Sequence, residues 1–316
     1  MKKIHGLICL ITLLFCCSII FVGCGNEEKE ISSLEHSGDY MTITDDMGRQ
    51  VVLTNKPERI VPLSASFLEP LHAVDGNVVA RVSAKTGIPK EDEDLPQVGN
   101  VYNINIEKVI EAQPDLVIAY KGMNDKFVSS FEDNGIPVIV LEMRTYDQVK
   151  HTVDVLGQIT GNKDKAIELI QNMDNKIADI KAKLPQETKN IAILHSTSQS
   201  VTVQLEGSIA GSVAEILGFN NIAKGTTPLE NNPTSAPYSL ETLVTANPDV
   251  IFVTSMGKME TIKKSMMEKC RKQSSMANIA SGKSSKSILF TTRIIFVKSR
   301  YPLSRSCRDY GEACLS

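Results

Sequence analysis

Two acidic residues, Glu107 and Glu241, stand at matched places in a phrase that the sequence carries twice. Residues 105–118 read NIEKVIEAQPDLVI and residues 239–252 read SLETLVTANPDVIF, so each position in the second phrase lies 134 residues after its counterpart. In both copies a capping residue precedes the helix that holds the glutamate, and a Pro-Asp pair and an apolar, β-rich run follow it. Two copies at this spacing favour two similar lobes over a solenoid, whose repeats span about 20–50 residues.

The paired glutamates have a local and a distant interpretation, and the two are compatible. Locally, Asn105 and Ser239 cap the helices, and an acid in the first turn stabilises the positive end of the helix dipole by about 0.3–1 kcal/mol. In the distant interpretation, a pseudo-two-fold axis relates the lobes and places the carboxylates at equivalent exposed corners. A two-fold symmetric partner with matching arginines then binds both at once.

Motifs for catalysis or metal binding are absent from the sequence. It contains no GxxxxGK[ST] phosphate loop, HExxH, CxxC or GxSxG. No cysteine lies between Cys24 and Cys270, and His36, His72 and His151 lack metal-ligand spacing. The formal net charge of -3, from 34 Lys and Arg against 37 Asp and Glu, argues against nucleic-acid binding. We therefore expect no enzyme activity, no catalytic residue and no metal site.

The first residues have the features of an export signal. Lys2 and Lys3 precede a nearly unbroken apolar run at residues 7–22, which is short for a membrane span but suits a signal peptide. The run ends in FVGC at residues 21–24, which resembles the lipobox of bacterial lipoproteins. That resemblance implies a signal peptide at residues 1–23, acylation of Cys24, a flexible tether at residues 24–39, and a body held on the extracytoplasmic side of the cell membrane. The alternative is an uncleaved anchor, or an ordinary signal peptide with a chance cysteine.

Apolar strands and helical patterns alternate along the rest of the chain, which predicts βαβ units and mostly parallel sheets. Residues 41–53 are expected to form a hairpin. Further strands are expected at residues 60–64, 78–82, 115–120, 137–141, 190–195, 201–205 and 250–254. Helices are expected at residues 67–74, 106–112, 126–133, 146–159, 164–184, 211–217, 240–246 and 259–270.

The stretch at residues 164–184 predicts one long helix, because it contains neither Gly nor Pro and its apolar residues recur at helical spacing. At 1.5 Å per residue it spans roughly 30 Å, the width of a small domain. The predicted fold class is therefore α/β, with two Rossmann-like lobes joined by a single long helix. The expected limits are residues 40–144 for the first lobe, 145–185 for the linking helices and 186–280 for the second lobe.

The sequence resembles the solute-binding lipoproteins of ABC importers, in the group that handles iron-siderophores, haem and cobalamin. The resemblance rests on the phrases TDDMGR (residues 44–49) and PERIV (57–61), the duplicated phrases, the lipobox and the long helix. It implies a monomer that captures an iron complex. The first choice for this complex is a ferric siderophore, and haem or cobalamin are the alternatives. This cargo goes to a permease dimer, without a resident cofactor. Glu107 and Glu241 match the family's acids that dock onto arginines of the two permease subunits.

The resemblance also places the ligand between the lobes, beside loops at the carboxyl ends of strands. Basic residues there suit an anionic chelate and tyrosines can stack on a flat ligand, although each residue taken alone is equally explained as a solvated loop residue. His195 is either an axial ligand for haem iron or a hydrogen-bonded loop histidine. By position, the expected cleft residues are Ser64, Lys85, Thr86, Tyr102, Tyr120, Lys121, Arg144, His195, Ser196 and Ser208.

Two other functions suit a two-lobed α/β scaffold. A cell-surface metal-dependent hydrolase needs clustered His, Asp or Glu in the cleft, and a protein that binds free zinc or manganese needs several such ligands between the lobes. The sequence shows no such cluster for the hydrolase, and only His195 is placed for the metal-binding protein. Binding of an iron complex is therefore the preferred interpretation.

Residues 281–316 depart from the pattern of the preceding chain. A polar stretch at 281–286 is followed by a β-rich run at 289–297 and then by residues without periodicity. Read one nucleotide later, suitable codons for residues 288–316 can spell FYLPQELFLLNPGIRYPEAVEIMAKLVYP, which resembles the strand, turn and amphipathic helix that end the family's chains. We therefore expect a frameshifted, non-native tail, a second lobe without its edge strand and covering helix, and poor folding after about residue 280.

Overall fold

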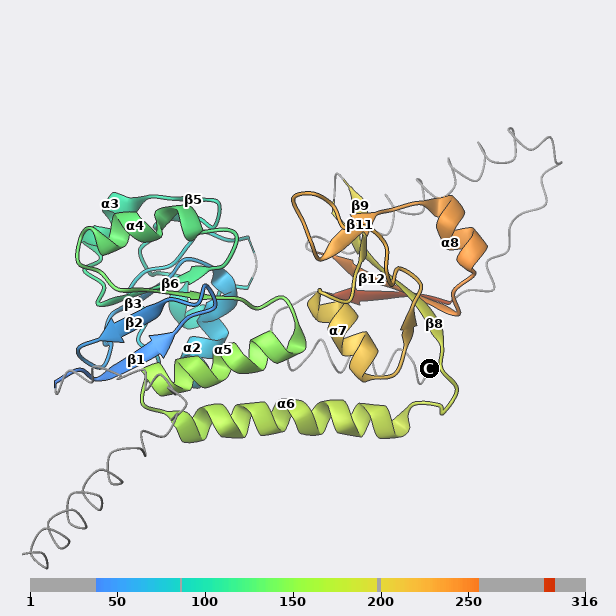
Figure 1. Ribbon diagram of the computed structural model, residues 1–316, viewed down its shortest axis with the longest axis horizontal. Coiled ribbons are helices and arrows are strands. Elements are labelled where there is room, and N and C mark those ends of the chain that lie inside the picture. The colour runs from blue at the N-terminus through green and yellow to red at the C-terminus, as the bar shows by residue number, and fades with distance from the viewer. Residues whose placement is uncertain (1–37, 86, 198–199, 256–292, 299–316) are drawn as a thin grey trace, which may run out of the picture. The chain divides into compact units, whose positions relative to one another are not determined.

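The computed structural model describes residues 38–85, 87–197, 200–255 and 293–298. The expected signal peptide, Cys24, Thr86, the expected helix at residues 259–270 and most of the tail lie outside the described residues. In the described part, helices and strands alternate as the sequence predicts, and they form two separate main sheets (Figure 1).

The first lobe is built on a parallel sheet of three strands in the order β3-β6-β7. Every residue of these strands is buried, as expected for parallel strands covered on both faces. Alternate residues of β6 and β7 enter two different apolar clusters, one on each face of the sheet. The strands are β3 (Ile60–Pro62), β6 (Leu116–Tyr120) and β7 (Val138–Leu141).

Short elements surround this sheet. The predicted hairpin is confirmed, since Met41 pairs with Leu53 and Thr44 with Gln50 in an antiparallel ribbon. The helices are α2 (Leu68–Ala73), α3 (Ile106–Glu111) and α4 (Val128–Glu132), with 3₁₀ turns η1 (Ala65–Phe67), η2 (Lys90–Asp92) and η3 (Asp125–Phe127). The remaining strands are β1 (Met41–Thr44), β2 (Gln50–Leu53), β4 (Gly99–Asn100) and β5 (Asn103–Ile104).

The strand expected at residues 78–82 is wrong. This segment makes only isolated bridges, from Val78 to Ile60 and from Arg81 to Gln97. The segment that pairs with Arg81 contains Pro96. The Pro96 carbonyl oxygen accepts a hydrogen bond from the Arg81 N–H, but Pro96 has no N–H of its own to continue a ladder. The buried Arg81 side chain instead donates to the carbonyl oxygens of Asp92 and Glu93, which holds the following loop in place.

Two helices, α5 (Tyr146–Ile159) and α6 (Lys163–Lys183), connect the lobes along the chain. A capping box fixes the start of α5, because the Thr145 hydroxyl accepts from Gln148 N and the Gln148 side chain accepts from Thr145 N. The predicted long helix is confirmed as α6, which has 21 residues and starts one residue earlier than expected. Buried side chains of α6 and of α7 belong to the same apolar cluster as those of α5.

The second lobe contains a sheet in the order β11-β9-β8-β12-β13, with β10 paired to β8. Strands β8, β10, β12 and β13 are parallel, whereas β9 and β11 run antiparallel to their neighbours. The strands are β8 (Asn190–Ser196), β9 (Val201–Gln204), β10 (Asn220–Asn221), β11 (Ser235–Pro237), β12 (Val250–Ser255) and β13 (Arg293–Lys298). The helices are α7 (Ile209–Ile216) and α8 (Leu240–Ala246).

Strand β13 corrects one expectation about the tail. It pairs in parallel with β12, from Val250 opposite Arg293 to Ser255 opposite Lys298. The expectation that this lobe lacks a strand beyond β12 is therefore wrong for residues 293–298. The physical reason is that a ladder uses backbone groups, so a run rich in β-branched residues such as RIIFVK can pair whichever reading frame encodes it.

Candidate functional site

The two glutamates of the duplicated phrase occupy equivalent local positions. Glu107 lies in the first turn of α3 and Glu241 in the first turn of α8, and both residues are exposed. Each helix is capped as expected, since Asn105 Oδ1 accepts from Lys108 N at 3.0 Å and Ser239 Oγ accepts from Thr242 N at 3.2 Å. Each carboxylate is thus presented at the exposed start of a short, capped helix.

The similarity of the two copies extends through the turn that follows each helix. Gln113 and Asn247, which occupy matching places, both adopt the left-handed conformation, with φ of 48° and 42°. The aspartates of the two Pro-Asp pairs then bind the strand next to their own. Asp115 accepts from Arg59 N, and Asp249 accepts from Asn190 N. The repeat is therefore a repeat of backbone conformation and of hydrogen bonding as well as of sequence.

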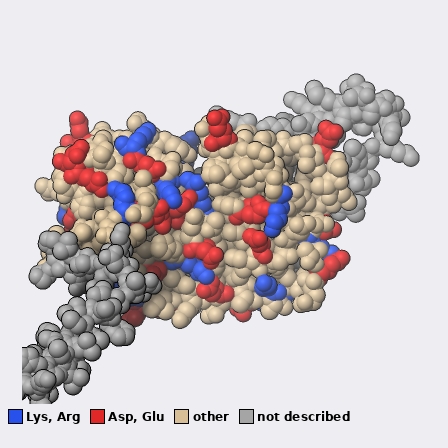
Figure 2. All heavy atoms as spheres, in the orientation of Figure 1, with Lys and Arg blue, Asp and Glu red and all other residues tan. Residues whose placement is uncertain are grey.

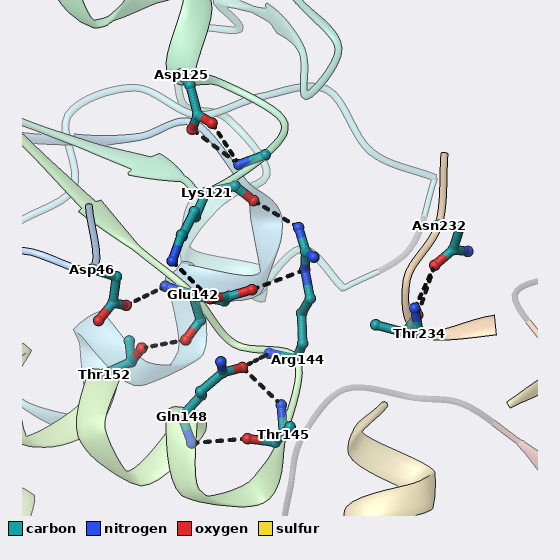
Figure 3. Close-up of polar contacts among 11 residues, drawn as sticks. Asp46, Lys121, Asp125, Glu142, Arg144, Thr145, Gln148, Thr152, Asn232 and Thr234 are labelled. Carbon is teal, nitrogen blue, oxygen red and sulfur yellow. Dashed lines mark hydrogen bonds and ion pairs between the residues drawn. The ribbon is translucent and has the colours of Figure 1, made fainter. Parts of the chain in front are cut away.

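Charged side chains gather where β6 and β7 end. Lys121 directly follows β6, Glu142 directly follows β7, and Arg144 comes two residues later. The two oxygens of Glu142 face different cations, with Oε2 3.3 Å from Lys121 Nζ and Oε1 3.3 Å from Arg144 Nε (Figure 3). The Glu142 side chain is only 15% exposed, so this carboxylate is screened from water and bridges the two bases.

The backbone around this cluster is fixed by further hydrogen bonds. Asp46 accepts from Glu142 N at 2.6 Å, and the Thr152 hydroxyl donates to the Glu142 carbonyl oxygen (Figure 3). Gln148 Oε1 accepts from Arg144 N at 2.9 Å, so the glutamine of the α5 capping box also fixes the place of Arg144. Lys121 and Arg144 were expected from the sequence, whereas Glu142 and Asp46 were not, because an acid gave no signal for a site expected to bind an anion.

The three serines predicted in the cleft are buried. Ser64 caps η1, where its hydroxyl accepts from Ser66 N. Ser208 caps α7, where its hydroxyl donates to the Leu205 carbonyl oxygen and accepts from Gly211 N. Ser196 is buried at the end of β8. The local hydrogen bonds of Ser64 and Ser208 explain both hydroxyls without a ligand.

Tyr102, Tyr120 and Lys85 have different surroundings. Tyr102 lies between β4 and β5 and is 67% exposed, which leaves its ring available to a flat ligand. Tyr120 is buried at the end of β6, with its ring centroid 5.7 Å from that of Phe67 in a tilted arrangement. Lys85 is exposed. Of the three, only Tyr102 and Lys85 present their side chains to solvent.

His195 is half-buried near the end of β8, opposite Thr254 in the register with β12. Its Nδ1 lies 3.1 Å from Thr254 Oγ1, which donates its proton to the Leu194 carbonyl oxygen. Burial lowers the pKa of His195 from its ordinary value of 6.5, because it disfavours the charged imidazolium.

Features of other functional classes are scarce in the part of the chain that the structure describes. No group of three or more His, Cys, Asp or Glu side chains there is placed to hold a metal ion. No helix among those residues is long and apolar enough to cross a membrane. Acidic and basic side chains are intermingled on the face drawn in Figure 2, without a broad basic area.

A cavity of about 420 Å³ lies at the other end of the second sheet, beside the start of β8 and β12. Leu184, Phe219 and Val250 are among its lining residues, and none of the predicted cleft residues lines it. Ligands of open α/β sheets bind at the carboxyl ends of strands. We therefore place the candidate site at the Lys121–Glu142–Arg144 cluster rather than at this cavity.

Comparison with known families agrees with this fold. Residues 60–286, more than two thirds of the chain, match the periplasmic binding protein family. The chain belongs to this family, and the resemblance to solute-binding proteins of ABC importers is confirmed.

Named relatives match more than half of this chain. An uncharacterised ABC transporter substrate-binding lipoprotein, YvrC, of Bacillus subtilis strain 168 is 25% identical over 276 residues, covering 84% of this chain and 85% of the relative. The Fe(3+)-citrate-binding protein YfmC of the same organism is 26% identical over 260 residues, covering 79% and 80%. A vitamin B12-binding protein of Vibrio parahaemolyticus is 25% identical over 209 residues, covering 64% and 73%.

Solved structures confirm the predicted fold class. Haem-bound IsdE of Staphylococcus aureus superposes with a TM-score of 0.64 at 17% identity, covering 82% of this chain and 99% of that chain. The vitamin B12-binding protein BtuF of Vibrio cholerae gives a TM-score of 0.62 at 18% identity, covering 82% and 96%. At these identities the likeness establishes the two-lobed α/β fold.

Proposed function

We propose that this protein is the extracytoplasmic substrate-binding component of an ABC importer, which captures an iron complex and delivers it to a permease dimer. The observation that carries the proposal is the duplicated unit, in which Glu107 and Glu241 stand exposed in the first turns of matching, capped helices. A permease with two related subunits can bind both acids through arginines, by charge-assisted hydrogen bonds. The proposed lobes are residues 40–144 and 186–280, joined by residues 145–185.

A ferric siderophore or a related ferric chelate is the proposed cargo. Relatives named for Fe(3+)-citrate and for a siderophore support this choice. Lys121 and Arg144 offer two cations at the strand ends, which suits an anionic complex. Haem and cobalamin are the alternatives, supported by the haem-bound structural neighbour and by the relatives named for vitamin B12. Exposed Tyr102 and half-buried His195 are the proposed contacts for a flat ligand of that kind.

Membrane attachment through Cys24 completes the proposal. Two of the relatives are named lipoproteins, and the phrase FVGC ends the apolar segment of this chain. An acyl chain on Cys24 would hold the protein on the outer side of the cell membrane. Labelling of cells with a fatty-acid analogue is expected to mark the wild type and not the Cys24→Ser variant. Equal labelling of the two proteins would contradict the anchor.

Titration of the full chain, purified in mild detergent, tests the substrate class. Ferric citrate, an uncharged ferric trihydroxamate, haemin and cobalamin are each followed by their own absorbance, because the chain contains no Trp to report binding. We expect micromolar or tighter binding of at least one ferric complex or of haemin. Binding of none of the four compounds by a chain that shows cooperative thermal unfolding would end the proposal.

A further inference from the structure

Arg144 makes three contacts, and one edge of its guanidinium group is free of contacts with the described residues. Its backbone N–H donates to Gln148 Oε1, its Nε faces Glu142 Oε1, and its Nη2 donates to the Lys121 carbonyl oxygen at 3.0 Å. A guanidinium has five N–H donors. Within the described residues no acceptor contacts Nη1, and in Figure 3 the terminal nitrogen that makes no contact points away from Glu142 and Lys121. The side chain is 23% exposed, so solvent reaches it.

This free edge has the geometry that a carboxylate requires. Nη1 and the second proton of Nη2 form a planar fork, which binds the two oxygens of a carboxylate through parallel hydrogen bonds. The edge lies at the carboxyl ends of β6 and β7, where ligands of open α/β sheets are bound. Lys121 adds a second cation beside it. A ligand group with one negative charge and two acceptor oxygens matches this arrangement.

Two neighbouring residues determine where the fork points. Glu142 engages Nε on the side opposite the free edge, and its low exposure keeps this ion pair in one place. Gly122 has a φ of 80° and no side chain, and a Cβ at this position would lie 2.6 Å from Arg144 Nη2. Any other residue at position 122 would therefore displace the end of Arg144 from the Lys121 carbonyl oxygen. Asp125 holds the turn by accepting from Gly122 N.

We propose that the free edge of Arg144 is a binding site for a carboxylate of the ligand, and that Glu142 and Gly122 are the positioning residues that aim it. The inference rests on the proposed function and narrows its substrate class to chelates that carry a carboxylate. Ferric citrate and haemin have such groups, whereas an uncharged ferric trihydroxamate and cobalamin have none.

Arg144→Lys tests the fork, because it keeps the charge and removes the planar pair of donors. We expect affinity for ferric citrate or haemin, whichever the wild type binds, to fall about tenfold or more, and affinity for the other two probes to change less than about threefold. The matched control is Arg49→Lys, since Arg49 belongs to the same lobe and also pairs with two carboxylates, Asp45 and Glu132. An unchanged affinity in Arg144→Lys would overturn the proposal.

Glu142→Ala separates positioning from simple charge attraction. Removing an acid makes the cluster more positive, so attraction alone predicts tighter binding of an anionic probe. The proposal predicts the reverse, a loss of about threefold to tenfold for the carboxylate probe, because the guanidinium loses its anchor and is repelled by Lys121. Glu132→Ala, which removes an equal charge elsewhere on the lobe, controls for net charge. Tighter or unchanged binding in Glu142→Ala would overturn the assigned role of Glu142.

The wild-type titration distinguishes the two levels of failure. Binding of the trihydroxamate or of cobalamin, without binding of ferric citrate or haemin, would overturn the carboxylate site and leave the proposed function standing. Binding of no probe would overturn the proposed function itself. Thermal unfolding of each variant, measured in parallel, excludes global unfolding as the cause of a lost affinity.

Discussion

Asp249 and Asn190 are joined by two reciprocal hydrogen bonds between neighbouring strands of the second lobe. Asn190 N donates to Asp249 Oδ2 at 2.8 Å, and Asp249 N donates to the Asn190 carbonyl oxygen at 2.8 Å. Asp115 and Arg59 make the same pair in the first lobe, at 2.9 and 3.0 Å. In each lobe the aspartate thus binds the turn that follows the short helix to the start of the adjacent strand. This contact fixes the position of the helix that carries the exposed glutamate.

Replacing Asp115 or Asp249 with Ala is expected to lower the free energy of unfolding by about 1–2 kcal/mol, because backbone donors lose a charged acceptor. The measurement is urea denaturation followed by circular dichroism. Asp133→Ala on the exposed end of α4 is the control and should change the stability by less than about 0.5 kcal/mol. Equal losses in the variant and in this control would show that the side-chain hydrogen bond of the aspartate has no energetic role.

Replacing either exposed glutamate should impair delivery and spare ligand binding. We expect Glu107→Ala and Glu241→Ala each to reduce uptake about tenfold, which corresponds to about 1.4 kcal/mol of lost docking free energy. Uptake of radioactive iron by cells and titration of the purified variants give the two measurements. Glu111→Ala, in the last turn of α3, provides the matched control. Normal uptake by the double variant would refute docking through these two acids.

The stability of the second lobe should depend on pH through His195. Burial lowers the pKa of His195, so below the ordinary value of 6.5 the unfolded chain binds a proton that the folded chain does not. The free energy of unfolding therefore falls as the pH decreases from 6.5 toward the lowered pKa. His195→Gln removes this contribution, so its melting temperature should fall less than that of the wild type between pH 7.5 and 5.5. Parallel pH dependences would exclude the effect.

Gly157 should be sensitive to any added side chain, because it lies where α5 and α6 come close together. A Cβ at this position would lie 2.4 Å from the Ala166 methyl group. We expect Gly157→Ala to cost about 1–3 kcal/mol of stability through overpacking. The double variant with Ala166→Gly should recover part of this loss, after a helix-propensity cost of about 1 kcal/mol. No recovery in the denaturation midpoint would place the strain elsewhere.

The proposed frameshift is tested at the level of DNA. The hypothesis places the change of frame near residue 280. We expect the nucleotide sequence of the locus, read one base later, to encode the strand, turn and helix spelled out above. A shifted frame that encodes anything else would remove the hypothesis. Limited proteolysis then tests residues 299–316, which we expect to be cleaved first.

Much of the fold was predictable from the periodic spacing of apolar residues and from the Gly and Pro residues that interrupt helices and strands. The helices at residues 146–159 and 240–246 have the limits that the sequence predicts, and the N-caps Thr145 and Ser239 explain where they begin. Two-residue strands such as β10 gave no signal, since they are too short for a pattern. The segment at residues 78–82 misled because its apolar residues are buried against the same clusters as the sheet, while its backbone makes only isolated bridges.

The candidate site was predictable in its cations and not in its acids. Position after a parallel strand identified Lys121 and suggested Arg144 near the same edge. Glu142, by contrast, lies between two bases because its backbone is fixed by Asp46, almost a hundred residues earlier in the chain. Such a long-range hydrogen bond leaves no local trace in sequence. Likewise, the capping roles of Ser64 and Ser208 became evident only from their backbone contacts.

The uninterrupted α6 has a consequence for how the importer would be supplied. A sharp bend in a helix almost always needs Pro, Gly or an inserted side chain, and the 21 residues of α6 contain neither Pro nor Gly. Because α6 lacks the residues that usually permit a sharp bend, we expect it to keep its shape when the proposed cargo binds, so that empty copies present the proposed docking acids much as full ones do. Empty and full copies would then compete for a limited number of transporters, so that producing more of the protein than there is chelate would slow import rather than speed it.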